Sequence, residues 1–357
     1  MKRRKLLILY TELAGYTLAC LRELDPLKIE VHLVRWQVNE EAPFDFIIPP
    51  NITFYEKSSL DKKKLLALAE RINPDSILCS GWMDKDYIHV VRKFSGKAIT
   101  ILTMDNKWEG TIRQQAARLV TKFTLTKYFN FIWVPGEKQK HFAQKLGFAA
   151  NQIQTGFYSA DVPFFREQYL ANMEKKRSDF PHRMIYVGRY YDFKGIRELW
   201  NAFIEAKKEM NNDWELWCLG KGDVPPIEHP SIKHFGFVQP AKMKSFISSC
   251  GVYVLPSHVE PWAVAVHEFA AAGFPLLLSE NVGAASAFLT EGENGFIFET
   301  KDTASIGNAL KKIMQMKNAE LIEMGNASAQ KALSITPKIW AEQLQDMIGS
   351  NELIKTK

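Results

Sequence analysis

Short apolar runs alternate with longer amphipathic stretches along almost all of the 357 residues. Several of the short runs are continuously apolar, which is typical of parallel strands covered on both faces. Strand–helix alternation of this kind predicts an α/β fold of βαβ units with doubly wound parallel sheets. The predicted strands are Lys5–Tyr10, Glu30–Trp36, Ile52–Tyr55, Ser76–Ser80, Ala98–Met104, Phe131–Pro135, Met184–Gly188, Glu215–Leu219, Lys233–Phe237, Val252–Leu255, Pro275–Leu278 and Gly295–Phe298. The predicted helices include Lys62–Ile72, Glu137–Leu146, Ile196–Met210, Ala241–Ser248 and Ala304–Met316.

About twelve strands in a chain of this length indicate two sheets, because single cores stop growing near 250–300 residues. The seam is expected between Phe157 and Arg183, a segment without strand character that carries two prolines and a charge run. We therefore predict two Rossmann-like domains, 1–165 and 166–337. In open α/β sheets, ligands bind beyond the carboxyl ends of the strands, so the site is expected in a cleft between two facing sheets.

The composition, 46% hydrophobic and 24% charged, excludes a disordered or collagenous protein. No apolar run approaches the roughly 18 residues of a membrane span. The N-terminal MKRRKLLILY has too few apolar residues for a signal peptide, so a cytoplasmic protein is expected.

The net charge of +6 allows two interpretations. One is an anionic partner, such as acidic lipid, nucleic acid or a phosphorylated substrate. The other, which we favour, is ordinary surface lysines, because no charge block exceeds four residues. The two clusters are Lys2–Lys5 and Lys62–Lys64, and no nucleic-acid-binding motif accompanies them.

Neither a disulfide framework nor a metal site is predicted. The four cysteines lie far apart in apolar settings, which indicates buried free thiols: Cys20, Cys79, Cys218 and Cys250. His258 and His267 lack a third ligand at metal-site spacing. Asp84-Lys85-Asp86 resembles a metal-binding D-x-D triad, but it precedes a helical pattern, so Asp84 is interpreted as its N-cap.

The strongest chemical signal is the pair Glu260 and Glu268, in the sequence LPSHVEPWAVAVHEFAAAGFPLLL. A strand leads through a loop into a helix expected to begin near Trp262, with Glu260 before it and Glu268 about two turns inside. The free N–H groups of residues 263–265 would point at an anion between them. The alternative is that Glu260 caps the helix and Glu268 is a solvated helix residue.

Three further segments place polar or flexible residues after strands. In IYVGRYYDFKG, Arg189 and Lys194 follow a strand and open a helix, which predicts a diphosphate clamp rather than two surface cations. In WELWCLGKGD, Gly220 would let the backbone approach a ligand closely. In IKHFGFV, Phe237 and Val238 form a plausible edge for a flat base.

Together these segments resemble the donor-binding half of glycosyltransferase family 4, also called glycosyltransferases group 1, which are retaining enzymes of GT-B fold. The resemblance is strong from Met184 to Thr300 and weaker over the first half. It rests on Gly188-Arg189, Lys194-Gly195, Gly220 with Gly222, Gly236-Phe237, Glu260/Glu268, Gly273-x-Pro275, Val282-Gly283 and Glu291-Gly292-x-Asn294-Gly295.

The resemblance implies a role for each matching residue. Arg189 and Lys194 would hold the diphosphate of the donor, with the helix N-terminus at Ala263 and Val264. Glu268 would bind the ribose hydroxyls, and Glu260 would face the transferred sugar as a catalytic residue. The base would contact the backbone of Phe237 and Val238. Ala263 stands where the family usually has glycine, which implies a tighter helix N-terminus around the phosphates.

In the first half, Gly15 is what remains of the family's glycine-rich loop after the first strand; a plain strand-to-helix turn is the alternative. The family's usual catalytic-site histidine is absent, and AITILTMDNKWEG offers Asp105 instead. A subgroup of the family carries an aspartate here, followed by a basic helix. Asp105 would accept a proton or orient an acceptor hydroxyl, or it would cap the following segment.

The implied reaction is metal-independent transfer of a sugar from a UDP- or GDP-sugar to a hydroxyl of a glycan or lipid-linked acceptor, as in the synthesis of surface polysaccharides or glycoconjugates. The first domain would bind the acceptor and the second the donor, and the last helix, around Ile339–Ile348 within the segment 338–357, would pack back on the first. No cofactor is expected, and the basic clusters could contact acidic membrane. Two alternatives stay open: an inactive sugar-nucleotide-binding relative, and a GT-B epimerase or phosphorylase.

Overall fold

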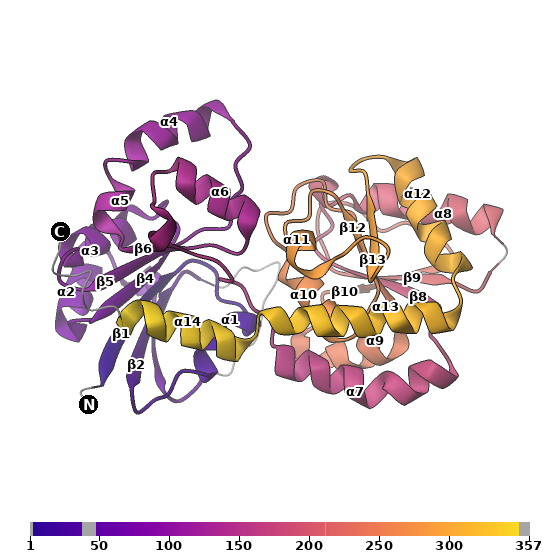
Figure 1. Ribbon diagram of the computed structural model, residues 1–357, viewed down its shortest axis with the longest axis horizontal. Coiled ribbons are helices and arrows are strands. Elements are labelled where there is room, and N and C mark those ends of the chain that lie inside the picture. Colours follow the sequence, from indigo (N-terminus) through magenta and orange to yellow (C-terminus); the bar gives the residue numbers. More distant parts are fainter. Residues whose placement is uncertain (1–2, 38–47, 211, 350–357) are drawn as a thin grey trace. The chain divides into compact units, whose positions relative to one another are not determined.

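A computed structural model describes residues 3–37, 48–210 and 212–349. The chain divides into two compact units. The second unit is Ala160–Thr336, and the first contains the described residues before and after it. Figure 1 shows that each unit has a central sheet with helices packed on it. The predicted α/β class with two parallel sheets is therefore confirmed.

The first unit contains a parallel sheet of seven strands in the order β3-β2-β1-β4-β5-β6-β7. Its strands are β1 (Arg4–Tyr10), β2 (Ile29–Arg35), β3 (Ile52–Glu56), β4 (Ser76–Ser80), β5 (Ile99–Thr103), β6 (Phe131–Trp133) and β7 (Ile153–Gln154). Its helices are α1 (Gly15–Arg22), α2 (Lys62–Ile72), α3 (Lys85–Phe94), α4 (Ile112–Thr121), α5 (Leu125–Tyr128), α6 (Glu137–Lys145) and α14 (Pro337–Gly349). Residues from α2, α3 and α6 form one hydrophobic cluster, and residues from α1 and α14 belong to a second.

The second unit contains a parallel sheet of six strands in the order β10-β9-β8-β11-β12-β13. Its strands are β8 (Arg183–Val187), β9 (Glu215–Leu219), β10 (Ile232–Gly236), β11 (Val252–Leu255), β12 (Leu276–Ser279) and β13 (Gly295–Phe298). Its helices are α7 (Val162–Ser178), α8 (Ile196–Glu209), α9 (Met243–Ser249), α10 (Val264–Ala271), α11 (Ala285–Phe288), α12 (Thr303–Gln315) and α13 (Asn318–Lys331). Strands β11 and β12 are buried along their whole length, as expected for a sheet covered on both faces.

The chain returns to the first unit through α14, which packs against α1 (Figure 1). Trp340 is buried there, and its ring stacks on Trp133 with 4.8 Å between the ring centroids. Its indole N–H donates to the carbonyl of Phe157 at 2.7 Å. Residues 350–357, which belonged to the predicted returning segment, lie outside the described residues.

Asp84 is the N-cap of α3, as predicted. Its carboxylate accepts the N–H groups of Asp86 and Tyr87 at 2.8 and 3.0 Å. Asp86 pairs with Lys57 at 3.1 Å. Both carboxylates of the D-x-D triad therefore have a structural role, and no group of three metal-ligating side chains occurs in the described part of the chain.

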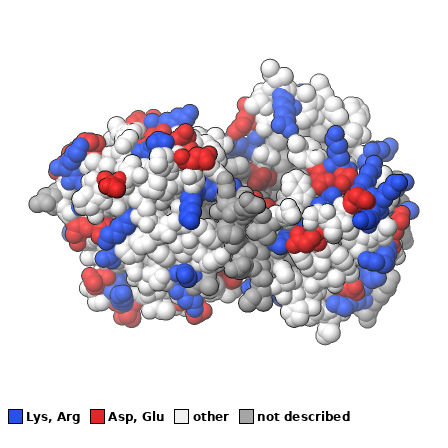
Figure 2. Space-filling view, turned by 180° about the vertical axis from the view of Figure 1, so that it is seen from behind, with Lys and Arg blue, Asp and Glu red and all other residues white. Residues whose placement is uncertain are grey.

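The four cysteines are buried free thiols, as predicted. Within residues 3–37, 48–210 and 212–349, no helix combines the length and apolarity that crossing a bilayer requires. On the face displayed in Figure 2, Lys and Arg side chains are interspersed with Asp and Glu side chains.

Candidate functional site

Two neighbouring strands of the second unit end at the same edge of the sheet. β8 and β11 are parallel and adjacent, so the loops after them lie together. Lys194, from the loop after β8, meets Glu260, from the loop after β11, with 2.5 Å between Nζ and Oε2. The side chains are only 18% and 12% exposed, which makes this a largely desolvated ion pair. The Ser257 hydroxyl donates to the same carboxylate oxygen at 3.2 Å.

Gly195 fixes the position of Lys194. Its φ is +67°, a conformation that favours glycine, and a Cβ there would lie 2.2 Å from the carbonyl oxygen of Pro256. The N–H of His258 also donates to the carbonyl of Phe193 at 2.8 Å. The loop after β8 therefore packs closely against the loop after β11 at Gly195, and this contact positions the Lys194 ammonium beside Glu260.

Gly220 and Gly222, in the loop after β9, allow that loop to lie against the backbone of the loop after β8. A Cβ on Gly220 would lie 1.8 Å from the carbonyl oxygen of Gly188, and one on Gly222 would lie 2.3 Å from that of Tyr190. The close backbone approach at Gly220 therefore includes the carbonyl of Gly188, and the approach of a ligand there stays a prediction. Arg189 is half-buried in that loop, where its carbonyl accepts the Tyr186 hydroxyl at 2.8 Å.

Helix α10 begins at Val264, two residues later than expected, and its N-cap is Ala263. Ala263 has a φ of +76° and makes no side-chain capping hydrogen bond. The left-handed conformation accounts for glycine at this position in the family, because a Cβ is strained there. The capping interpretation of Glu260 is wrong, since Ala263 is the cap and Glu260 instead engages Lys194 and Ser257.

The loop after β12 supports the segment that carries Glu260. The N–H of Gly283 donates to the carbonyl of Glu260 at 3.0 Å, and that of Ala284 donates to the carbonyl of Trp262 at 2.9 Å. A Cβ on Gly283 would lie 2.0 Å from the carbonyl oxygen of Pro261. The Val282-Gly283 motif therefore has a structural function as the backing of the Glu260 loop.

Glu268 lies inside α10 and is half-buried. Burial raises the pKa of its carboxyl from 4.5 to about 7, and the charge of Asp161 contributes to the same rise. The interpretation of Glu268 as a solvated helix residue is therefore wrong. The two glutamates therefore differ: Glu260 is paired with Lys194, whereas burial keeps the pKa of Glu268 raised.

Tyr253 belongs to the apolar run VYVL, and nothing in the sequence distinguishes it from the other core residues of that strand. It is fully buried in β11, and burial raises the pKa of its hydroxyl well above the ordinary value. The negative charges of Glu260 and Glu268 add to this rise. Within the described residues no hydrogen-bond partner reaches this hydroxyl.

His267 is buried and structural. Its Nδ1 accepts the N–H of Ala160 at 3.0 Å, and its Nε2 donates to the carbonyl of Ala332 at 2.9 Å. Burial lowers its pKa to about 4, so the ring is neutral at pH 7. His258 lies apart from it, 3.2 Å from the Glu198 carboxylate.

The predicted base-binding residues follow the edge strand β10. Gly236 ends that strand with a φ of +67°, and Phe237 and Val238 are half-exposed beyond it. The strands are parallel, so Phe237 and Val238 lie at the same carboxyl end of the sheet as the Arg189 loop. Strand β9 separates β10 from β8, so the two segments are two strands apart.

In the first unit, Asp105 follows β5 and accepts a hydrogen bond from the Tyr158 hydroxyl at 3.3 Å. Thr111, not Asp105, is the N-cap of α4. Gly15 opens α1, and a Cβ there would meet no atom within 4 Å, so packing does not require the glycine.

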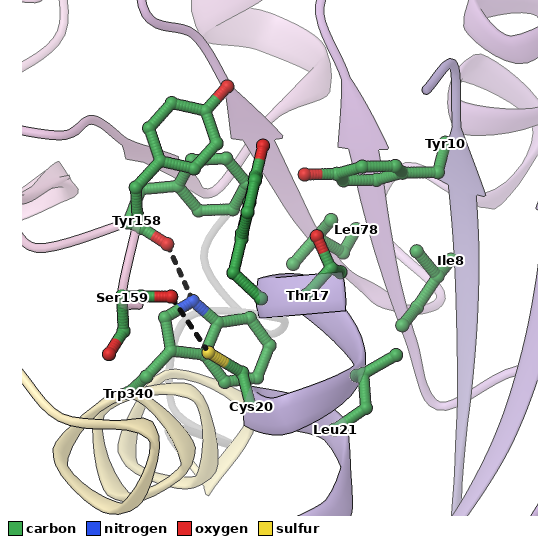
Figure 3. A pocket seen from close by; sticks show the side chains of 11 residues that line it. Ile8, Tyr10, Thr17, Cys20, Leu21, Leu78, Tyr158, Ser159 and Trp340 are labelled. Carbon is green, nitrogen blue, oxygen red and sulfur yellow. Dashed lines mark hydrogen bonds between the residues drawn. The ribbon is translucent and has the colours of Figure 1, made fainter. Parts of the chain in front are cut away.

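A small cavity of about 10 Å³, which has room for one water, lies between α1 and Tyr158 in the first unit. Figure 3 shows its walls, which come from β1, β4, α1, α14 and residues 157–159. Its lining includes Tyr10, Thr17, Cys20, Tyr158 and Trp340.

Comparison with known proteins gives a consistent picture. Residues 181–316 match the family model of the glycosyl transferases group 1. The 2-deoxystreptamine N-acetyl-D-glucosaminyltransferase of Niallia circulans is 27% identical over 169 residues, which are 44% of this chain and 41% of that protein. The chain therefore aligns with less than half the length of this relative.

Solved structures match over nearly the whole chain. Sucrose-phosphate synthase from Thermosynechococcus elongatus superposes with a TM-score of 0.71 at 15% identity, covering 98% of this chain and 99% of that one. Anabaena HepE in complex with UDP-glucose gives a TM-score of 0.70 at 12% identity, covering 98% and 100%. Residues 181–316 are therefore similar to the glycosyl transferases group 1, and the two parallel-sheet units have the GT-B fold.

Proposed function

We propose that this protein transfers a sugar from a nucleoside-diphosphate sugar to a hydroxyl group, with retention at the anomeric carbon. The observation that carries the proposal is the desolvated Lys194–Glu260 pair, 2.5 Å long, in the loops beside the N-terminus of α10. An anionic diphosphate and a polar sugar are ligands that such a lysine and glutamate can share. The family match over residues 181–316 supports the same chemistry.

Lys194 changes partners in this proposal. Without donor, its ammonium is neutralised by Glu260. The diphosphate replaces that carboxylate as the partner of Lys194, and Glu260 is then released to accept hydrogen bonds from the sugar. A stored ion pair of this kind lets each group enter the donor complex without being left as an unpaired buried charge.

Leaving-group stabilisation falls to Arg189, Lys194 and the free N–H groups at the start of α10. As the bond between the anomeric carbon and the diphosphate oxygen breaks, these groups take up the negative charge that develops on that oxygen. The acceptor hydroxyl forms the new bond on the same face and loses its proton. Asp105 accepts that proton, or it orients the hydroxyl and the proton passes to the departing diphosphate oxygen. No metal or cofactor takes part in the proposal.

The donor is proposed to be a UDP- or GDP-sugar, with UDP tested first because HepE was solved with UDP-glucose. Glu268 is proposed to bind the ribose, and Gly220, Phe237 and Val238 to border the base. The acceptor is proposed to be a glycan or lipid-linked sugar bound by the first unit. The protein would then act in the cytoplasm in polysaccharide or glycoconjugate synthesis, with peripheral contact to acidic membrane.

Thermal unfolding with a panel of nucleoside diphosphates tests the proposal. A ligand at about 100 times its Kd stabilises by roughly 2.7 kcal/mol. We expect UDP or GDP to raise the melting temperature with or without EDTA, and Lys194→Met to abolish the shift. The absence of any nucleotide response would contradict the proposal.

Donor turnover separates an enzyme from an inactive relative. Slow hydrolysis of the matching nucleotide sugar, followed by NMR of the anomeric proton, is expected even without acceptor. Nucleotide binding with no hydrolysis or transfer would favour the inactive sugar-nucleotide-binding alternative. Inversion of the anomeric configuration would contradict the retaining reaction.

A further inference from the structure

Helix α4 of the first unit exposes its apolar residues to solvent. Ile112, Leu119 and Val120 lie on the helix, and Phe123 lies in the turn after it. Their spacing, i, i+7, i+8 and i+11, places them in one stripe. Ile112 is 89% exposed, Phe123 is 76% exposed, and the other two are more than half exposed. A helix of a soluble protein ordinarily turns such a stripe toward the core.

Polar contacts hold α4 in this inverted orientation. The side chain of Gln114 donates to the carbonyl of Lys107 and accepts the N–H of Glu109, both at 2.8 Å. Thr121 is buried, and its hydroxyl lies 3.3 Å from the carbonyl oxygen of Leu146, at the end of α6. The face toward the protein is therefore the polar one, and the exposed stripe is a built feature of the helix.

Cations flank the stripe. Residues 110–127 contain no Asp or Glu and four basic residues, which are Arg113, Arg118, Lys122 and Lys127. Arg113 reaches the loop after β4, where its guanidinium lies 3.6 Å from the sulfur of Met83. Met83 is itself 66% exposed and extends the apolar surface.

We propose that this surface, formed by α4, Phe123 and Met83, docks onto the anionic face of a lipid bilayer. Apolar side chains entering the acyl boundary, with basic residues at the headgroups, are the arrangement of an interfacial helix. A second copy of the chain is a poorer occupant, because pairing two such surfaces would bring four cations against four. The basic segment instead complements a negatively charged surface.

The position of α4 in the chain relates membrane docking to the predicted acceptor site. α4 follows β5 through the loop that carries Asp105, so the docking helix and the predicted acceptor-site residue belong to one connection. Two residues of the N-terminal basic cluster, by contrast, have partners within the unit, since Arg4 donates to the carbonyl of Ile348 and Lys5 to that of Ile72. The inference rests on the peripheral membrane contact of the proposed function and names the surface that makes it, but it does not depend on the transfer reaction.

Co-sedimentation of the full chain with vesicles tests this proposal. We expect binding to phosphatidylglycerol–phosphatidylcholine vesicles and little binding to phosphatidylcholine alone. Leu119→Ser with Phe123→Ser should weaken the binding at least tenfold. Changing Arg113, Arg118 and Lys122 to Gln should weaken it by about fivefold per cation, and raising the salt concentration should have the same direction of effect.

Leu27→Ser is the matched control, because Leu27 belongs to the same unit and is 84% exposed. It should bind vesicles as the wild type does. All variants change exposed residues, so their unfolding midpoints and their response to nucleoside diphosphate should match the wild type. That response also separates failure of membrane docking from failure of the proposed function.

Three outcomes would overturn the inference. The first is wild-type protein that does not bind anionic vesicles at low salt. The second is a loss of binding in Leu27→Ser as large as that of the double variant. The third is a dimer in solution, seen by light scattering and removed by Leu119→Ser with Phe123→Ser, which would make the surface a contact between copies.

Discussion

Glu268 combines a cost in folding with a proposed role in binding. Its carboxyl has a pKa raised to about 7, so the native state binds more protons than the unfolded state between about pH 4.5 and 7. Stability from this group is therefore greatest at low pH and falls as the pH rises through that window. Above pH 7 the desolvated charge destabilises the unliganded protein.

We expect Glu268→Gln to stabilise the unliganded protein by about 1–3 kcal/mol at pH 8 and by much less at pH 5. The same change should weaken nucleoside-diphosphate binding roughly ten- to a hundredfold, because a charge-assisted hydrogen bond to the ribose is worth about 1.5–3 kcal/mol. Urea unfolding at both pH values and a nucleotide titration measure the two effects. Unchanged nucleotide affinity would remove Glu268 from the ribose site.

Glu260→Gln should fail differently. The amide no longer neutralises Lys194, so the ammonium is available to a diphosphate without first giving up a carboxylate. Bare nucleoside diphosphate should therefore bind at least as tightly as to the wild type, while turnover of the nucleotide sugar is lost. Lys194→Met is the control, since it should lose diphosphate binding. Weaker diphosphate binding by Glu260→Gln would contradict the exchange of partners.

Ala263→Gly is expected to stabilise the protein by about 0.5–1 kcal/mol. The left-handed conformation costs an alanine roughly 1–2 kcal/mol, part of which is offset by the greater unfolded-state entropy of glycine. Lys301→Gly is a matched control, because Lys301 has a φ of +66° and lies at a distant turn. Both variants should melt higher, but only Ala263→Gly should alter nucleotide affinity. A destabilised Ala263→Gly would show that the strain is absent.

Among the elements, the strands were the most predictable. Continuous apolar runs predicted the twelve longer ones to within a few residues, whereas β7 has only two residues and no pattern to reveal it. The segment without strand character was correctly separated from the strands, but it forms the 17-residue helix α7. A sequence pattern cannot show that α4 turns its apolar stripe outward, because the polar contacts of Gln114 and Thr121 decide it.

The candidate site, too, was predictable from the sequence only in part. The resemblance to the family's motifs predicted Arg189, Lys194, Glu260 and Glu268 as one donor site. That the loops after β8 and β11 meet follows from the pairing of these two strands in the structure. The pairing of Lys194 with Glu260 needed the backbone contact between Gly195 and Pro256, and no one-dimensional pattern contains it.

Helix α14 tests how an element distant in sequence completes a core. Trp340→Ala removes a buried ring that stacks on Trp133 and donates to Phe157, so we expect a loss of about 3–5 kcal/mol. Lys338→Ala, on the exposed side of the same helix, should stay within about 0.5 kcal/mol of the wild type. Chemical denaturation followed by tryptophan fluorescence compares them. Equal losses of unfolding free energy in Trp340→Ala and Lys338→Ala would show that the packing of the Trp340 ring does not account for the effect.

At the scale of the whole molecule, His267 joins the beginning of the second unit to its end. His267 accepts from Ala160, the first residue of the unit, and donates to Ala332, four residues before the end of the unit. Each unit also has its own buried core. These features favour separate unfolding of the two units.

We therefore expect calorimetry of the full chain to resolve two transitions. Nucleoside diphosphate should raise only the transition of the second unit, which carries Lys194 and Glu268, by the mass-action amount. Trp340→Ala should lower only the other transition, because its contacts lie within the first unit. Combining the variant with saturating nucleotide should move the two transitions apart. A single transition that shifts with both perturbations would show instead that the units unfold as one cooperative structure.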